Sequence, residues 1–132
     1  MTDMFAGCEQ LVSVNLSGLN TETVGTMEQM FAGCESLQTL DLSNFTDFSL
    51  QTMEGMFNGC LALTSLDIRG FEFGENTGNA PNMTDTFYNI NVNCVITVGS
   101  QYAKDYLINT ASISGLDQLT DINNQIVIAA QA

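Results

Sequence analysis

This sequence of 132 residues lacks several residue types: it contains no histidine and no tryptophan, and only Arg69 and Lys104 are basic. Without histidine the chain can form no Ser-His-Asp triad, no Cys-His catalytic pair and no histidine-ligated zinc site. Fifteen acidic residues oppose the two basic ones and give a net charge of -13. That balance argues against nucleic acid and anionic membrane surfaces as partners, because both are bound through lysine and arginine.

Long apolar runs are also missing. No stretch approaches the roughly 20 apolar residues that a membrane-spanning helix needs, and residues 1–30 lack the basic and apolar regions of a signal peptide. The chain is nevertheless 45% hydrophobic and only 13% charged, which is not the composition of a disordered chain. We therefore expect a folded, acidic unit of ordinary domain size that does not itself insert into a membrane.

What the sequence does contain is an internal repeat. The segment Met-Phe-x-Gly-Cys occurs three times at a spacing of 26 residues, at 4–8, 30–34 and 56–60. A fourth, degenerate copy follows a four-residue insertion in the Gly/Asn-rich stretch 73–82. A repeat of this length cannot bury its apolar side alone, so copies are expected to stack on one another.

The first half of each copy has the apolar spacing of a helix. In the second copy the apolar residues fall at i, i+3, i+4 and i+7, namely Met27, Met30, Phe31 and Cys34. Residues suited to the N-cap precede these segments, and residues suited to a left-handed helix end follow them. The cap candidates are Thr26, Thr52 and Asn82, and the left-handed candidates are Gly7, Gly33, Gly59 and Asn89. The pattern predicts a short helical turn in each copy.

The second half of each copy alternates apolar and polar residues, as a strand with one buried face does. The predicted fold is therefore α/β: a leucine-rich-repeat solenoid with short helical turns on one side, a parallel sheet on the other and a C-terminal cap. Residues 1–98 form the array, with about four copies, the first truncated and the last degenerate. The competing solution is a right-handed parallel β-helix, against which the helical spacing of the Met/Phe/Cys segments argues.

The C-terminal third is expected to close the array as part of the same structural unit, at residues 99–132. Ser100 can cap a helix, and Ile126–Ile128 can form a last strand. Leu116, Leu119 and Ile122 indicate a further short turn. Just before the cap, alternation predicts one more buried-face strand through Val92, Cys94, Ile96 and Val98.

The pattern M-x-x-M-F-x-G-C-x-x-L-x-x-L-D-L-S-x-F is clearest at Met27–Phe45 and Met53–Phe71. It resembles the repeat of BspA-type bacterial leucine-rich-repeat surface proteins, over roughly residues 1–98. The resemblance implies a secreted or cell-surface protein that faces other cells or a host, with adhesion as its usual role and no enzymatic activity. Because Met1 aligns with Met27 and Met53, we expect a fragment whose signal, anchor and further repeats lie outside it.

Strand alternation predicts a polar surface on the outward side of the sheet. Solenoid curvature would make this the concave side, where repeat proteins usually bind their partners. Its hydroxyl and carboxylate groups suit hydrogen bonding to a protein or a glycan on a host or neighbouring cell. The candidate ligand-binding residues are Asn15, Ser17, Thr39, Asp41, Ser43, Ser65, Asp67 and Arg69. The competing interpretation is a face that is only solvated.

Two aspartates on this surface are a possible chemical centre. Asp41 and Asp67 occupy equivalent positions 26 residues apart and should lie about 5 Å from each other on neighbouring strands. Two carboxylates at such a short distance share a proton, recruit a cation, or have their mutual repulsion relieved by a nearby basic side chain. Arg69 is the basic residue closest to them in the sequence. Calcium, which needs oxygen ligands, and a glycosidase acid/base pair are the open alternatives. We expect no metal, no cofactor and no catalytic residue.

The cysteines recur with the repeat. Cys8, Cys34 and Cys60 occupy one position in successive copies, close enough for a disulfide on distance alone. Their side chains should nevertheless point the same way and form an inner ladder of small buried residues that resists thiol reagents. Cys94 is out of register with the ladder and is expected in the core. Metal binding is disfavoured because C-x-x-C spacing and histidine are lacking.

The leading hypothesis is a non-enzymatic, extracellular interaction module of a bacterial surface protein that binds a protein or glycan through the concave face. The alternatives are a structural spacer that presents another domain and a carboxylate-pair hydrolase. Three observations would separate them. A deep pocket holding both Asp41 and Asp67 favours the hydrolase, exposed aromatic side chains on the face favour the binding module, and a featureless face favours the spacer.

Overall fold

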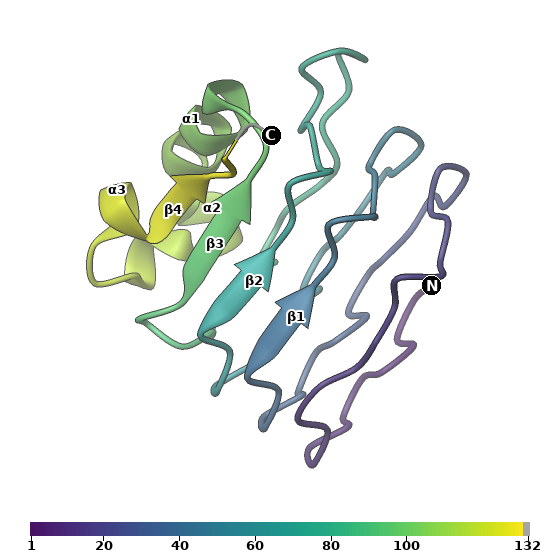
Figure 1. The fold of residues 1–132 in the computed structure, drawn as a ribbon, viewed down its shortest axis with the longest axis vertical. Helices are drawn as coiled ribbons and strands as arrows, with labels where there is room; N and C mark the ends of the chain where they lie inside the picture. The colour runs from purple at the N-terminus through teal and green to yellow at the C-terminus, as the bar shows by residue number, and fades with distance from the viewer. Residues whose placement is uncertain (131–132) are drawn as a thin grey trace.

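The computed structural model describes residues 1–130 and shows a mixed α/β fold (Figure 1). Among these residues, four strands form one parallel sheet in the order β1 (Thr39–Asp41), β2 (Ser65–Asp67), β3 (Val95–Val98) and β4 (Ile126–Ile128). Helices follow β3: α1 (Gln101–Asn109), α2 (Ala111–Ser114), the 3-10 turn η1 (Leu116–Gln118) and α3 (Ile122–Gln125). The last two residues of the predicted cap, 131 and 132, lie outside the described residues.

The sheet is in register with the repeat. On the exposed side, Thr39 pairs with Ser65 and Ser65 with Val95. On the buried side, the adjacent row is Leu40, Leu66, Ile96 and Ile126. Each residue of that buried row is at most 3% exposed. A constant repeat length places the same residue type opposite itself in neighbouring strands, so one face stays apolar and the other polar. The predicted sheet and its buried side are confirmed from β1 onward.

The first copy departs from this prediction, because the structure assigns no strand to residues 13–17. This copy is joined to the next near its predicted strand by a hydrogen bond from the N–H of Gln38 to the carbonyl of Val12, at 3.1 Å. Strands β2 and β3 have a hydrogen-bonded neighbour on both sides. The first copy has a described neighbour on one side only.

The prediction of helical turns in the Met/Phe/Cys segments is wrong. These segments form successive turns. Each contains two left-handed residues four positions apart, and the later one is the predicted glycine or asparagine. The positive φ angles are 53° and 75° at Gln29 and Gly33, and 62° and 80° at Gly55 and Gly59. An α-helix cannot continue through a left-handed residue. The predicted left-handed positions themselves are confirmed at Gly7, Gly33, Gly59 and Asn89.

The backbone hydrogen bonds of these turns run between copies. The N–H of Phe5 donates to the carbonyl of Met30, that of Phe31 to Met56 and that of Phe57 to Thr86, each at 2.8 Å. The helical spacing that separated a leucine-rich repeat from a β-helix therefore no longer distinguishes them. The predicted buried side is nevertheless correct, because all four residues of the second copy are 0% exposed: Met27, Met30, Phe31 and Cys34.

The predicted N-caps act as turn residues. The Thr26 and Thr52 hydroxyls accept the N–H two positions later, at 3.3 and 3.2 Å, and the Asn82 amide oxygen does so at 3.1 Å. The three residues also pair with one another as parallel bridges. Their preference for local hydrogen bonds is as predicted, but the element that follows is a turn.

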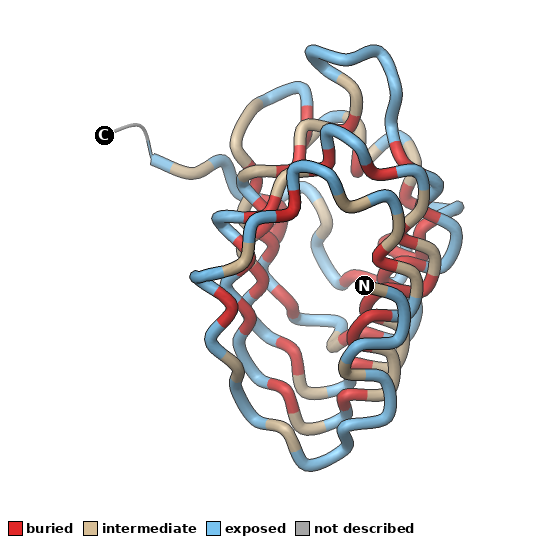
Figure 2. The backbone as a smooth tube through the Cα atoms, turned by 90° about the vertical axis from the view of Figure 1, so that its right-hand side faces the viewer, coloured by how far each residue is buried: buried red, intermediate tan, exposed pale blue. Residues whose placement is uncertain are grey.

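The core is built from ladders of identical side chains. Phe5, Phe31, Phe57 and Phe87 stack in sequence with ring centroids 5.3, 5.8 and 5.6 Å apart. Stacked aromatic rings contribute attraction beyond the burial of their surface. Figure 2 shows buried positions recurring at the same place in neighbouring copies. The repeat thus holds together through like-on-like packing as well as through the sheet.

The C-terminal segment packs against the fourth repeat copy, and the predicted helix cap is present. Ser100 caps α1, since its hydroxyl accepts the N–H of Ala103 at 3.1 Å. The carbonyls of Ile113 and Ser114 at the end of α2 accept the N–H groups of Asp85 and Phe87 at 3.0 and 2.8 Å. These N–H groups are equivalent to those that reach a further copy elsewhere in the chain. A helix end, whose last carbonyls need donors, is a suitable terminus for such a ladder.

The strand predicted to begin at Val92 begins instead at Val95, and Val92 is exposed. Asn91 explains the difference, because its side chain accepts the N–H of Asn93 and its carbonyl that of Cys94. The resulting turn keeps Val92 out of the ladder. None of the helices in the described part of the chain has both the length and the apolar character to cross a membrane.

Candidate binding surface

The outer sheet face is the surface formed by the side chains that point away from the core on β1 to β4 and on the matching part of the first copy. All eight predicted site residues are solvent-accessible, with Asp67 half-buried: Asn15, Ser17, Thr39, Asp41, Ser43, Ser65, Asp67 and Arg69. Val95, Thr97 and Val127 extend the face towards the C-terminal end. Val127 was not among the predicted residues, although the run Ile126–Ile128 carried the same alternation signal.

One position on this face ends the extended segment in each of three copies. The side-chain oxygen of Asn15 accepts the N–H of Ser17 at 3.0 Å, and Asp41 and Asp67 accept the N–H groups of Ser43 and Arg69 at 2.9 and 3.1 Å. Asparagine and aspartate favour such turns because their side chains mimic a backbone acceptor. These residues therefore shape the fold as well as the surface.

Asp67 is neutralised by the guanidinium of Arg69. The Nη2 atom of Arg69 lies 2.7 Å from Oδ2 of Asp67, and its Nε atom lies 3.1 and 3.0 Å from the two carboxylate oxygens. The hydrogen bonds and charge of Asp67 raise the pKa of Arg69. Arg69 thus relieves the repulsion between the two aspartates, as predicted, by pairing with Asp67. The pair is exposed to solvent, so it contributes little to stability.

Asp41 lies opposite Asp67 in the register of β1 and β2. Hydrogen bonds from Ser43, through its side chain first and its backbone N–H second, lower the pKa of Asp41. The more distant charge of Arg69 acts in the same direction. In the described part of the chain Asp41 forms no ion pair. It is an exposed carboxylate whose ionised form is favoured mainly by the hydrogen bonds from Ser43.

A pocket of about 290 Å³ lies beside Asp41, between the first and second copies. The carboxamide N–H groups of Asn44 build one wall, since they donate to the carbonyls of Leu16 and Leu19 at 3.1 and 2.8 Å. Asp67 does not line this pocket, so the two aspartates do not share it. The full lining is Val14, Asn15, Leu16, Ser17, Asp41, Ser43 and Asn44.

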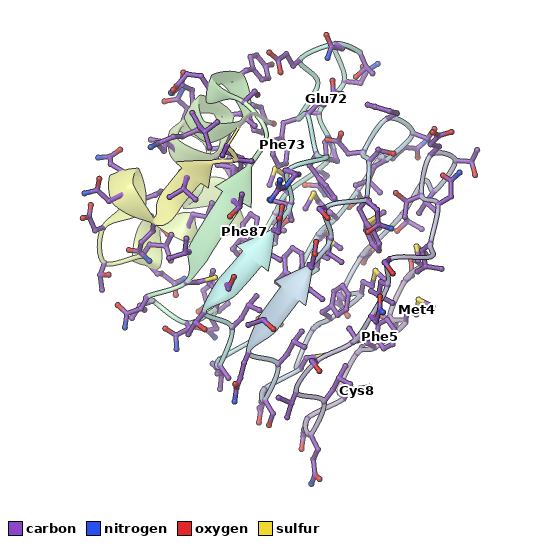
Figure 3. The ribbon with its side chains drawn as sticks, in the orientation of Figure 1. Met4, Phe5, Cys8, Glu72, Phe73 and Phe87 are labelled. Carbon is purple, nitrogen blue, oxygen red and sulfur yellow. The ribbon has the colours of Figure 1, made fainter. Side chains whose placement is uncertain are left out.

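The structure brings no metal-binding group together in residues 1–130, where no three His, Cys, Asp or Glu side chains converge. The four cysteines are free thiols. Cys34, Cys60 and Cys94 are buried, as predicted, and burial raises the pKa of both Cys60 and Cys94 to about 12. Cys8 is exposed, so the prediction that it belongs to the buried ladder is wrong for this copy (Figure 3).

The sequence did not lead us to predict that the carboxylate of Asp47 is buried. Asp47 is 3% exposed, and its two oxygens accept the N–H groups of Glu72 and Phe73, both at 2.9 Å. Burial raises its pKa, an effect that these hydrogen bonds only partly oppose. A polar residue also occupies the equivalent position in the copy before, Thr21, and that coincidence was the available signal.

Comparison with known protein families matches residues 1–97 to DUF285, which is described as a Mycoplasma protein of unknown function. The matched residues contain the repeat copies and stop inside β3. Comparison with curated proteins and with solved structures gives no match. The match covers well over half of the chain, and its description names neither BspA nor leucine-rich repeats. This chain belongs to the DUF285 family.

Proposed function

We propose that the chain is part of a BspA-type leucine-rich-repeat solenoid and acts as a non-enzymatic interaction module outside a bacterial cell. Its partner is a protein or a glycan on a host or neighbouring cell, and its binding surface is the outer sheet face. The observation that carries the proposal is the in-register display of polar side chains by successive copies, with Thr39 beside Ser65 and Asp41 beside Asp67.

Several features support binding through this face. The opposite side of each strand is committed to the core, because Leu40, Leu66 and Ile96 are at most 3% exposed. Neighbouring strands repeat at about 5 Å, which sets hydroxyl and carboxylate groups at regular intervals over a continuous surface. Such a grid offers many weak hydrogen bonds, and repeat proteins use extended surfaces of this kind for recognition.

The arrangement of the aspartates favours binding over hydrolysis. A glycosidase needs two carboxyl groups facing one substrate, one of them free to donate a proton. Asp67 is engaged by Arg69, and only Asp41 lines the pocket. A carboxylate with a lowered pKa is also a poor proton donor near neutral pH.

One observation favours the structural spacer as a second candidate. The exposed aromatic side chains in the described residues are Phe48, Tyr88 and Tyr102, and none belongs to the outer sheet face. Aromatic anchors often supply much of the affinity of a binding surface. A spacer would need only the solubility that the acidic surface provides.

Blocking the centre of the face tests the proposal. Ser65 lies on β2 between Thr39 and Val95 and is exposed, so Ser65→Trp places a bulky side chain over the grid without touching the core. The chain is applied to immobilised arrays of extracellular-matrix proteins and cell-surface glycans. We expect a partner whose affinity falls by about tenfold or more in Ser65→Trp, as for substitutions at an interface centre.

Ser112→Trp is the matched control, because Ser112 is exposed on α2 and lies away from the sheet. Retention of binding by Ser112→Trp, with loss in Ser65→Trp, supports the outer sheet face. Equal binding by both variants would move the site elsewhere. An array on which the unsubstituted chain binds nothing would favour the spacer.

A further inference from the structure

Two equivalent carboxylates on the outer sheet face differ in their counter-charge. Asp41 and Asp67 are direct partners in the register of β1 and β2. Two residues after Asp67 stands Arg69, which binds its carboxylate through Nε and Nη2. Two residues after Asp41 stands Ser43, whose short side chain carries no charge. The chain therefore contains one completed aspartate–arginine unit and one that lacks its arginine.

A pocket lies beside Asp41, the aspartate that is not followed by an arginine. The space beside Asp41 is about 290 Å³, close to the lower end of the roughly 300–1,000 Å³ typical of small-molecule sites. A pocket of this size suits one long side chain better than a whole ligand. Its apolar walls at Val14 and Leu16 can contact the methylene stem of such a side chain, while Asp41 meets the charged end.

Neither basic side chain of the chain forms an ion pair with Asp41. Arg69 is held by Asp67, and the Nζ atom of Lys104 donates to the carbonyl of Asn123 at 2.8 Å. These are the two basic residues of a chain with 15 acidic ones. A net charge of this size attracts cationic surfaces over long range and speeds their encounter. Asp41 is therefore accessible to a cation from another molecule.

We propose that the pocket beside Asp41 is a docking site for an arginine side chain of a partner protein, which pairs with Asp41 as Arg69 pairs with Asp67. The inference rests on the proposed function, because it names the partner chemistry for the same face. A guanidinium is the appropriate group, since its planar fork can meet both oxygens of a carboxylate.

The test uses a peptide that carries one arginine, acetyl-Gly-Ser-Arg-Ser-Gly-amide, and the same peptide with citrulline, its neutral isostere. Binding is followed by amide chemical shifts in the full chain. We expect the arginine peptide to shift the signals of Asp41, Ser43 and Asn44, and the citrulline peptide to leave them unchanged. Asp41→Asn should weaken binding about threefold or more, which is the effect of an exposed ion pair at its upper range.

Asp117→Asn is the matched control, because it removes the same charge from an exposed position in the cap. Two further variants exchange the residues that differ between the copies. Ser43→Arg should supply the missing guanidinium internally and abolish peptide binding. Arg69→Ser should expose the carboxylate of Asp67 and add a second set of shifted signals around it. Dispersed spectra of all four variants verify that they are folded.

Equal weakening by Asp41→Asn and Asp117→Asn would show general charge attraction and overturn the proposal. Equal binding of the citrulline peptide, or retained binding by Ser43→Arg, would overturn it too. The proposed function fails separately. A partner that Ser65→Trp blocks but Asp41→Asn leaves unaffected would keep the outer sheet face as the site and reject the arginine pocket.

Discussion

Asp47 shows how a single buried side chain joins two copies of the repeat. It lies in the second copy and accepts backbone N–H groups from Glu72 and Phe73 in the third. In the first copy the hydroxyl of Thr21 accepts the N–H of Thr46 in the same way, at 2.9 Å. Backbone donors at these bends have no strand partner, so a side chain must satisfy them. The sequence shows that both positions are polar, and the stacking of the copies shows which N–H groups they accept.

The contribution of Asp47 to stability should be greatest in acid. Because its pKa is raised in the folded state, the folded chain binds this proton more tightly than the unfolded chain. Its stabilising effect is complete below the ordinary value of 3.8 and is lost as pH rises through the folded pKa. Urea unfolding from about pH 4 to about pH 7 should show the wild type losing stability relative to Asp47→Asn.

Asp117→Asn corrects this measurement for the change in net charge, because it removes an exposed carboxylate instead of a buried one. A wild type that gains stability over Asp47→Asn as pH rises would contradict the prediction. It would mean that the bonds from Glu72 and Phe73 to the ionised carboxylate outweigh the cost of its burial.

At the scale of the element, the turn segment of each copy is defined by two left-handed residues. They orient alternate N–H groups towards the neighbouring copy, so the segment pairs like a strand while it turns like a loop. Gly59 lies at the second of these positions, with a φ of 80°. A Cβ added there would meet Gly33 only at ordinary contact distance, 3.5 Å, so conformation and not space requires glycine.

Gly59→Ala should therefore destabilise the chain by about 1–2 kcal/mol, the cost of a left-handed residue with a side chain. Gly59→Asn should lose less, because asparagine tolerates this conformation and Asn89 already occupies the equivalent position with a φ of 58°. The free energy of unfolding in urea is the measurement.

Gly25→Ala is the control, since a Cβ at Gly25 meets open space and the backbone there is not left-handed. It should change stability by no more than about 0.5 kcal/mol. A Gly59→Ala variant as stable as Gly25→Ala would refute the left-handed assignment of the turn.

At the scale of the whole molecule, the two ends of the stack differ. The C-terminal end is covered by α1, α2, η1, α3 and β4. The first copy is covered on one side only, and its would-be core residues remain accessible, with Met4 50% exposed and Phe5 partly buried (Figure 3). The same sequence motif is thus core in one copy and surface in another.

The thiols report this difference directly. In the native 132-residue chain Cys8 should react rapidly with a thiol reagent, whereas Cys34, Cys60 and Cys94 should react only on unfolding. Burial protects the latter three thiols and also disfavours their reactive thiolate form. Mass spectrometry measures the number of modified thiols over time. We expect one thiol to be modified rapidly and three to be modified slowly.

Cys8→Ser provides the control, because it should remove the fast group and leave the slow ones unchanged. Rapid labelling of a second cysteine without denaturant would contradict the buried ladder. Slow labelling of Cys8 would show that the first copy is covered in solution, for example by another molecule of the same chain.

Much of this fold followed from the 26-residue spacing. Equivalent residues recur at equivalent places, which determined the parallel register, the buried rows and the polar outer face. Residue type and local sequence were also sufficient to predict the left-handed conformation of Gly33 and the helix cap at Ser100. These features depend on side-chain type and near neighbours, and both are written in the sequence.

The helical spacing of Met27 to Cys34 was misleading because burial on one side and helical backbone are separate properties. The sequence reported the first, whereas the inter-copy hydrogen bonds decided the second. Likewise, the sequence indicated which residues form the outer sheet face, but not that Asp41 and Asp67 have different surroundings on it. Only the tertiary structure paired Asp67 with Arg69 and set Asp41 beside a pocket, because both depend on how the copies stack.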